Sequence, residues 1–357
     1  MIIKDFVLFN PKGKKPTDYV NYIDTSSVED GKLIDIQRLS DNIPSRAQRV
    51  IEEGDILISS VRPILKHNYY VSQHIENGIA STGFIQIRAD GSKAIPQYLY
   101  YFLTEENKVK MYQTIAETSQ STFPSFNKDV IENMAFPDVS LAEQQHIVDI
   151  LGSIDDSIEN NEKIAADLED YAISKYQELT RGIRDFIPLG EIVDIYDSKR
   201  KPLSSRERES RKGDYRYYGA TGVLDYVNDY LFDGEYVLLA EDGTVIDENG
   251  YPIVQLVTGQ FWVNNHAHIM QAKAGYTNYS LYVALKKLSV NTAVTGAVQL
   301  KINQANLCAL ELPKIDENEL SAFNQDIEPL FLKMIHIRAE IEKLNELKQL
   351  YLHKFFG

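Results

Sequence analysis

The chain has 357 residues, of which 43% are hydrophobic and 25% are charged. This length is too great for one hydrophobic core, so we expect two to four ordinary globular domains and exclude wholesale disorder. The lone Cys308 excludes an intrachain disulfide and a cysteine-rich metal site, which favours the cytoplasm. No apolar run approaches the roughly 18 to 20 residues of a membrane span, and the N-terminus lacks the pattern of a secretion signal.

The net charge of −15 argues against DNA binding only if the charge is spread evenly. It is not spread evenly, because residues 138–181 contain eleven acidic and three basic residues and so contribute −8. The rest of the chain is only mildly acidic. An acidic helix surface suits a protein partner or solvent better than a phosphate backbone.

In chain order, the first half predicts a strand at residues 84–88, a turn at Asp90-Gly91, a short helix at 96–112 and a long helix at about 138–181. The second half predicts a strand at 236–240, turns at Asp233-Gly234 and Asp242-Gly243, a short helix at 279–288 and a long helix at about 316–356. Because Asp and Gly tolerate positive φ, we expect the three Asp-Gly pairs to form hairpin turns.

The two halves of the chain repeat one design. Three pairs of segments recur at offsets of 186, 180 and 176 residues: 12–16 with 198–202, 54–59 with 234–239, and 126–137 with 302–313. The shrinking offset indicates two copies separated by small deletions. The predicted fold class is therefore α+β, with globules at 1–136 and 183–312 and long helices within 137–182 and 313–357.

Both long helices carry an apolar seam with alternating steps of three and four residues, which is typical of helix pairing. At 1.5 Å per residue each helix is about 55 Å long, more than one face of such a globule. We therefore expect the helices to pair antiparallel, although each could instead pack on its own globule. The pairing positions we predict are Ile147, Leu151, Ile154, Ile158, Asn161, Leu168, Ile327, Met334, Ile341 and Leu344. The polar Asn161 would fix the register or is simply a tolerated position.

Basic turns recur at equivalent places in the two globules, as expected if both bind phosphates. A charge run is otherwise more typical of a solvated loop. Polar loops at 118–122 and 295–301 offer hydroxyl and amide groups at the right reach for base edges. The predicted DNA-binding residues are Lys12, Lys14, Lys15, Arg46, Arg49, Arg62, Lys66, Ser119, Gln120, Ser121, Lys199, Arg200, Lys201, Arg206, Arg208, Arg211, Lys212, Arg216, Tyr217 and Lys301.

Signatures of catalysis are missing from the sequence. His266 and His268 alternate on a predicted strand, but no third ligand lies nearby in sequence, so we expect no metal site. The sequence has no glycine-rich phosphate loop, no dinucleotide fingerprint and no carboxylate cluster typical of nucleases. Asn10-Pro11 is followed by Lys12 and not by the aromatic residue of an amino-methyltransferase motif. We predict neither a catalytic residue nor a bound cofactor in this chain.

Two α+β globules alternating with two long helices resemble the specificity subunits of type I restriction-modification systems. Residues 121–137 look like the family's approach to its conserved helix, and Leu-Ala-Glu-Gln-Gln-His-Ile-Val at 141–148 looks like the beginning of that helix. Tyr-Tyr-Gly-Ala-Thr-Gly-Val at 217–223, with 234–243, is similar to many second recognition domains. The second globule opens with residues 187–191 as family domains do, whereas the first begins past that point, which leaves the edge of the first globule open.

The resemblance implies that each globule is a target-recognition domain for one half of an asymmetric, bipartite DNA sequence, while the helices set the unread gap. It also implies two methyltransferase partner subunits, which use S-adenosylmethionine on adenine, and a motor-nuclease subunit. Two alternatives remain open: a bifunctional methyltransferase or nuclease, and a coiled-coil scaffold that does not bind DNA.

Overall fold

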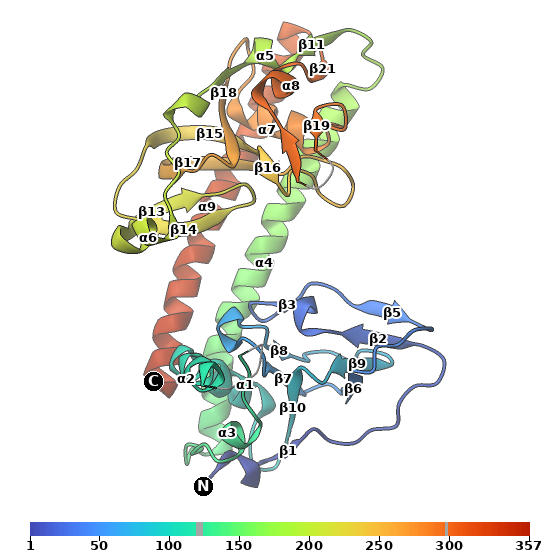
Figure 1. Cartoon of the computed structure of the whole chain (residues 1–357), viewed down its shortest axis with the longest axis vertical. Coiled ribbons are helices and arrows are strands. Elements are labelled where there is room, and N and C mark those ends of the chain that lie inside the picture. Colours follow the sequence, from blue (N-terminus) through green and yellow to red (C-terminus); the bar gives the residue numbers. More distant parts are fainter. Residues whose placement is uncertain (119–123, 297–298) are drawn as a thin grey trace. The chain divides into compact units, whose positions relative to one another are not determined.

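A computed structural model describes residues 1–118, 124–296 and 299–357 (Figure 1). The chain forms two compact units: unit 1 comprises residues 1–159 and 342–357, and unit 2 comprises residues 160–341. Two long helices, α4 (Leu141–Leu179) and α9 (Glu317–Phe356), each contribute one part to unit 1 and the other to unit 2. Among the described residues, no helix combines the length and apolar character needed to cross a membrane.

Unit 1 is built on two four-stranded sheets with the orders β1-β10-β7-β8 and β5-β2-β9-β6. Its strands are β1 (Val7–Phe9), β2 (Val20–Ile23), β3 (Val28–Glu29), β4 (Lys32–Leu33), β5 (Gln37–Leu39), β6 (Ala47–Val50), β7 (Ile56–Ser59), β8 (Tyr69–Tyr70), β9 (Gly78–Ser81) and β10 (Phe84–Ala89). Its shorter helices are η1 (Ile3–Asp5), η2 (Thr25–Ser27), η3 (Pro63–Leu65), α1 (Pro96–Thr104), α2 (Glu106–Glu117) and α3 (Asp129–Glu132).

The main core of unit 1 lies between the first sheet and α1, and it includes residues from both long helices. Pro96 at the first position of α1 has the φ that a helix needs, so α1 begins at this residue. Tyr98 and Phe102 on α1 make ring contacts with Phe356 near the end of α9. The end of α9 is also bound through Lys108, whose amino group donates to the Phe356 carbonyl at 2.8 Å.

Unit 2 has a six-stranded sheet with the order β12-β18-β15-β17-β13-β14. Its strands are β11 (Phe186–Pro188), β12 (Val193–Ile195), β13 (Lys212–Tyr218), β14 (Val223–Val227), β15 (Phe232–Ala240), β16 (Asp242–Gly243), β17 (Val254–Val263), β18 (Ala267–Ala272), β19 (Val294–Thr295), β20 (Leu300–Ile302) and β21 (Glu311–Pro313). Its shorter helices are α5 (Leu189–Ile192), η4 (Asp197–Lys199), α6 (Ser205–Ser210), α7 (Asn278–Lys286) and α8 (Gln304–Cys308).

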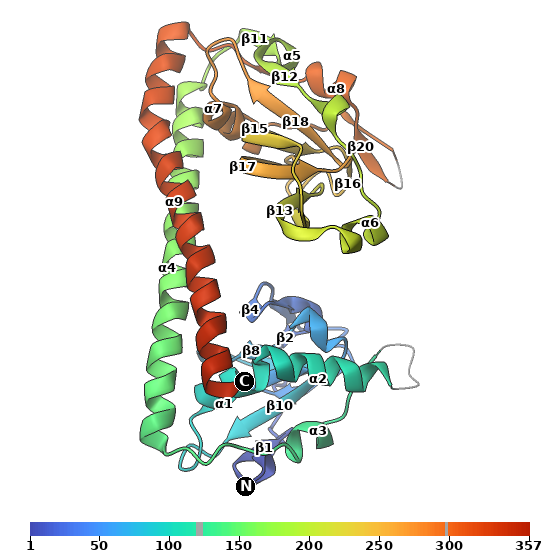
Figure 2. The same ribbon diagram turned by 90° about the vertical axis from the view of Figure 1, so that its left-hand side faces the viewer.

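The main core of unit 2 lies between this sheet, α7 and the unit 2 parts of α4 and α9 (Figure 2). Thr277 caps α7 by accepting from the Ser280 amide, so the helix begins where the sequence pattern changes. The Tyr279 ring stacks on Phe331 of α9, with ring centroids 4.9 Å apart. The Tyr282 hydroxyl donates to Glu169 of α4 at 2.7 Å.

The internal repeat predicted from sequence is present in the sheets. β1-β10-β7-β8 corresponds to β12-β18-β15-β17, and the paired positions Val7–Ala89 correspond to Val193–Ala272. Strands β2 and β9 pair in parallel, as do β13 and β17. Even the edge is repeated, because the Ile2–Ala135 bridge corresponds to the Pro188–Glu311 pair between β11 and β21. Residues 1–5 are therefore the counterpart of residues 187–191, so the expectation that the first globule begins past this point is wrong. The α+β class and its twofold repeat are confirmed.

The two long helices pack antiparallel within each unit. In unit 1, Lys348 of α9 lies 2.6 Å from Asp155 of α4, and in unit 2 the Phe323 ring contacts Tyr176. Within unit 2, Lys175 pairs with Asp326 while the next residue, Tyr176, contacts Phe323, so the numbers run in opposite directions. Of the predicted pairing positions, those with less than a tenth of the side chain exposed are Ile147, Leu151, Ile154, Ile158, Ile327 and Met334. The partly exposed ones are Asn161, Leu168, Ile341 and Leu344.

The helix seams also pack on the globules, so the two interpretations of the seams are both correct. Ile147 and Leu151 belong to the core of unit 1, while Ile327 and Met334 belong to the core of unit 2. Each helix therefore contributes to globular packing as well as to helix pairing.

The hairpin prediction for the Asp-Gly pairs is wrong. Asp90-Gly91 leads from β10 into α1, and Asp90 is hydrogen-bonded to Ser92. Asp233-Gly234 lies inside β15, where Gly234 pairs with Gly259 in a ladder that continues on both sides. Asp242-Gly243 forms β16, which pairs with the distant β20. At Asp233-Gly234 the long ladder between β15 and β17 overrides the local turn preference.

Candidate nucleic-acid interface

The predicted basic segment of unit 2 divides into buried and exposed cations. Arg200 is only 11% exposed; its guanidinium lies 2.7 Å from the Glu241 carboxylate and donates to the Ala267 carbonyl at 2.6 Å. Its second terminal nitrogen lies 3.4 Å from Asp197. Arg200 is therefore part of the internal structure of unit 2. Lys199 and Lys201 on either side are exposed, although the Lys199 amino group also lies over the Tyr196 ring.

Asp197, Glu241 and His268 form a compact group whose ligand atoms all lie within 4.8 Å of one another. Both ring nitrogens of His268 face acceptors: Nδ1 lies 2.6 Å from Asp197 and Nε2 lies 2.8 Å from the Ile302 carbonyl. Each ring nitrogen of His268 is thus already next to a protein oxygen. Burial alone would raise the pKa of Glu241, but hydrogen bonds and charge from Arg200, His268 and Lys301 outweigh burial and lower it.

This group is better described as a buried ion network than as a metal centre. Arg200 and Lys301 supply the positive charge that a cation would bring, with Lys301 3.1 Å from Glu241. His266, the other candidate ligand, instead contacts Asp242. The sequence alone did not predict the network, because Asp197 and Glu241 lie far from His268 along the chain and only the fold brings them together.

The remaining basic residues of this segment lie beside β13 and β14. Arg208 and Lys212 both pair with Asp225, at 3.1 and 2.8 Å. Lys212 and Arg208 hold the pKa of that carboxyl below its ordinary value, with the hydrogen bond from Lys212 as the larger cause. Arg211 is exposed and lies over the Trp262 ring. Arg206 on α6 is exposed as well.

Two predicted residues of β13 itself are less exposed. The Tyr217 side chain is buried and its hydroxyl accepts from the Leu203 amide, so its role here is structural. Arg216 is partly buried and pairs along β13 with Tyr226 of β14. The exposed apolar residues of this edge, which sequence reasoning missed, are Val223, Leu224, Tyr226 and Tyr230. Cations and exposed aromatic rings therefore share one edge of the unit 2 sheet.

In unit 1, the basic turn at residues 12–15 is exposed, and Lys15 donates to the Ala47 carbonyl at 3.1 Å. Lys12 and Lys14 are exposed, and neither is paired with another of the described residues. Arg46, which directly precedes Ala47 and β6, is exposed. Arg49 is partly buried, burial lowers the pKa of its guanidinium, and its Nε has no hydrogen-bond partner among the described residues.

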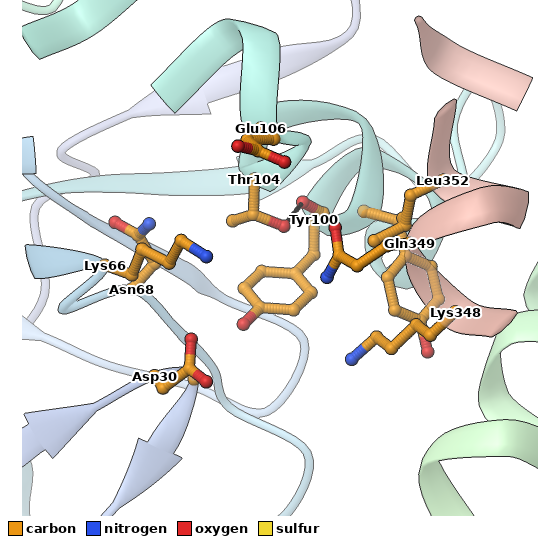
Figure 3. Close-up of a pocket in the computed structure, with 11 residues that line it drawn as sticks. Asp30, Lys66, Asn68, Tyr100, Thr104, Glu106, Lys348, Gln349 and Leu352 are labelled. Carbon is orange, nitrogen blue, oxygen red and sulfur yellow. Dashed lines mark hydrogen bonds between the residues drawn. The ribbon is translucent and has the colours of Figure 1, made fainter. Parts of the chain in front are cut away.

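Arg62 and Lys66 flank η3 in the connection from β7 to β8. Arg62 is exposed, whereas the Lys66 amino group points into a small hollow of about 70 Å³ that Asp30, Tyr100 and Glu106 also line (Figure 3). The predicted loop residues Ser119, Gln120 and Ser121 lie outside the described residues. The segment that follows them is placed beside this connection by a bridge between Val61 and Ser125.

Equivalent segments thus come together in both units. In unit 1 the strand-end segment at Val61 pairs with Ser125, and in unit 2 Asp242 pairs with Lys301. The offsets of these pairs are 181 and 176 residues, and the neighbouring ladder has the same offset of 181, because Ser59 pairs with Phe84 as Ala240 pairs with Ala267. Each unit therefore presents a paired set of loop segments at the same place in its fold, which is where the sequence predicts contact with DNA.

The family model "Type I restriction modification DNA specificity domain" matches residues 2–170 and again residues 185–349. Two Haemophilus influenzae relatives are similar over part of the chain. The specificity subunit S.HindORF215P is 39% identical over 35% of this chain and 32% of its own length. The HindI specificity subunit is 30% identical over 43% of this chain and 34% of its own length. The chain thus covers about a third of each.

A third relative, the type I restriction enzyme MjaIX specificity subunit of Methanocaldococcus jannaschii, is 24% identical over 96% of this chain and 85% of its own length. Among solved structures, the S subunit of a type I restriction-modification system from M. genitalium aligns with a TM-score of 0.55 at 15% identity. That alignment covers all of this chain and 95% of the other. The two family matches coincide with the two copies of the repeat, so the chain belongs to the type I restriction-modification DNA specificity family.

Proposed function

We propose that this chain reads a bipartite, asymmetric DNA target, with one globule assigned to each half. It performs no chemistry itself and acts in the cytoplasm as the specificity subunit of a larger complex. The observation that carries the proposal is the repeated loop geometry, because two equivalent readers in one chain suit a target with two halves. Family membership supports it independently.

The partners in this proposal are duplex DNA, two methyltransferase subunits and a motor-nuclease subunit. The methyltransferase subunits would bind S-adenosylmethionine and methylate adenine. The acidic surface of α4, including exposed Asp149, Asp156 and Asp167, suits a protein partner better than DNA. Positive charge on those partners would offset the net charge of −15 when the complex meets DNA.

The paired helices would act as the spacer between the two readers. Their buried seam and the ion pairs Lys348–Asp155 and Lys175–Asp326 hold α4 and α9 together within each unit. A helix pair of defined length would then define the gap of unread base pairs.

A domain exchange tests the proposal. Residues 183–312 are replaced by the matching domain of a relative, and methylated sites are mapped in cells that express the variant with its methyltransferase partner. We expect one half of the methylated motif to change and the other half to persist. A motif that changes in both halves, or in neither, would contradict the assignment of one globule to one half.

Two further measurements separate the alternatives. S-adenosylmethionine binding by the purified chain alone would favour a bifunctional methyltransferase. An absence of salt-dependent DNA binding by the complex would favour a coiled-coil scaffold.

A further inference from the structure

The connection between β7 and β8 in unit 1 has an unusual backbone. Arg62 has φ 47° and ψ 60°, and Lys66 has φ 52° and ψ 34°, so two residues with side chains adopt the left-handed conformation on either side of η3. This conformation is costly for residues other than glycine. Strain of this kind persists only where the surroundings enforce it, and it is concentrated at functional sites.

The surroundings of this turn do enforce its shape. The Arg62 amide donates to the Pro124 carbonyl at 3.0 Å, and the Ile64 amide donates to the Gln113 side chain on α2 at 3.2 Å. Buried Asn68 accepts from the Ser59 amide at 3.0 Å. Pro63 is buried beneath the turn. The backbone of residues 62–66 is therefore fixed before any partner binds.

This rigid turn exposes two aliphatic side chains to solvent. Ile64 is 49% exposed and Leu65 is 47% exposed, and the exposed Arg62 lies beside them. The Lys66 amino group points away into the hollow of Figure 3, which Asp30 also lines. Two half-exposed aliphatic side chains thus stand beside an arginine on a turn whose backbone is strained.

The other copy of the repeat lacks this arrangement. At the equivalent place, which pairs with Lys301 as Val61 pairs with Ser125, unit 2 has Asp242 and Gly243. Gly243 has φ 82°, which glycine adopts without strain, and the exposed Thr244 follows it. The aliphatic turn is therefore a property of unit 1 alone, as expected of a feature that distinguishes one reader from the other.

We propose that residues 62–66 enter a groove of duplex DNA in the half-site that unit 1 reads, with Ile64 and Leu65 against thymine C5 methyl groups and Arg62 on a phosphate. This inference rests on the proposed function. The major groove displays the thymine methyl as its one apolar feature, so aliphatic side chains there discriminate thymine from the other bases. Rigidity of the turn reduces the entropy lost on binding.

The test uses the full chain co-purified with its methyltransferase partner. Binding is measured to its target duplex and to duplexes in which thymines of one half-site are replaced by deoxyuridine, which lacks the C5 methyl. For the native chain, each contacted methyl should be worth about fourfold in affinity, as one buried methyl group is. The double variant Ile64→Ala/Leu65→Ala should bind the thymine duplex more weakly than the native chain does. Its affinity should not fall further when deoxyuridine replaces thymine in the half-site that unit 1 reads.

Leu8→Ala is the matched control, because Leu8 is 63% exposed on β1, the opposite edge strand of the same sheet. It should respond to deoxyuridine as the native chain does. Arg62→Gln should weaken binding to all duplexes and reduce the salt slope by about one.

Two results would overturn the inference: equal sensitivity of the double variant and the native chain to deoxyuridine, or a large fall in the melting temperature of the double variant, which would make these side chains core. Failure of the proposed function is distinguishable, because the native complex would then show no preference for its target over unrelated duplexes.

Discussion

At the scale of single residues, exposure and pairing separate cations that can meet a phosphate from cations that hold the protein together. Lys199, Lys201 and Arg211 are exposed, whereas Arg200 lies within an ion network with Asp197 and Glu241. These residues belong to one basic run in the sequence, where nothing distinguishes them. Their roles differ because Arg200, directly after η4, contacts Glu241 just beyond β15 and Ala267 on β18. Only the tertiary fold brings these residues together.

This difference predicts opposite outcomes for neighbouring substitutions. Lys199→Glu/Lys201→Glu should weaken binding of the complex to all DNA sequences and flatten its salt dependence, while leaving the stability of the free chain nearly unchanged. Arg200→Ala should instead destabilise the chain by about 1 to 3 kcal/mol, because Asp197 and Glu241 lose the guanidinium that they share while Lys301 and His268 remain beside them. Urea unfolding and salt-dependent DNA binding measure the two effects. A stable Arg200→Ala protein would contradict the network's structural role.

At the scale of elements, the sequence predicted the long helices from their apolar periodicity and the two units from their internal repeat. The long helices, predicted at about 138–181 and 316–356, are α4 at Leu141–Leu179 and α9 at Glu317–Phe356. Strands at 84–88 and 236–240 lie within β10 and β15. The single short helix predicted at 96–112 is two helices, because the backbone at Glu105 leaves the helical conformation. Interactions between distant segments, such as Asp197 with His268, had no local signal.

The sequence predicted only the charged residues of the strained turn at residues 62–66. Arg62 and Lys66 were predicted for their charge, but nothing in the sequence marked Ile64 and Leu65 as exposed. A left-handed residue is usually predicted from glycine or asparagine, and this turn has neither. Its conformation depends on Pro124 and Gln113, which lie about 50 to 60 residues away along the chain.

The helix pair makes a prediction about spacing. One heptad lengthens a helix by about 10.5 Å, and DNA rises about 3.4 Å per base pair, so seven residues inserted in both helices should lengthen the unread gap by about three base pairs. The half-sequences should stay the same, because the globules are unchanged. Insertion in one helix alone should destabilise the chain, because the seam beyond the insertion loses its partners. Mapping of methylated sites measures the gap, and an active double insertion with the original gap would show that the helices do not set it.

At the scale of the whole molecule, the chain is two copies of one α+β unit joined through two shared helices. Unit 1 is completed by residues from the far end of the chain, because Phe356 packs against Tyr98 and Phe102 and accepts a hydrogen bond from Lys108. Unit 2 is likewise completed by α4 and α9, through Tyr176 and Phe331. In each unit, the globule thus shares one hydrophobic core with the parts of α4 and α9 that are proposed as the spacer.

The most direct test of the central claim is to map adenine methylation across the host genome with this gene present and with it deleted. The account predicts that one methylated motif disappears on deletion, and that this motif has two specified halves of different sequence separated by a fixed unread gap. A methylation pattern unchanged by the deletion, or a lost motif that is short and continuous, would contradict it.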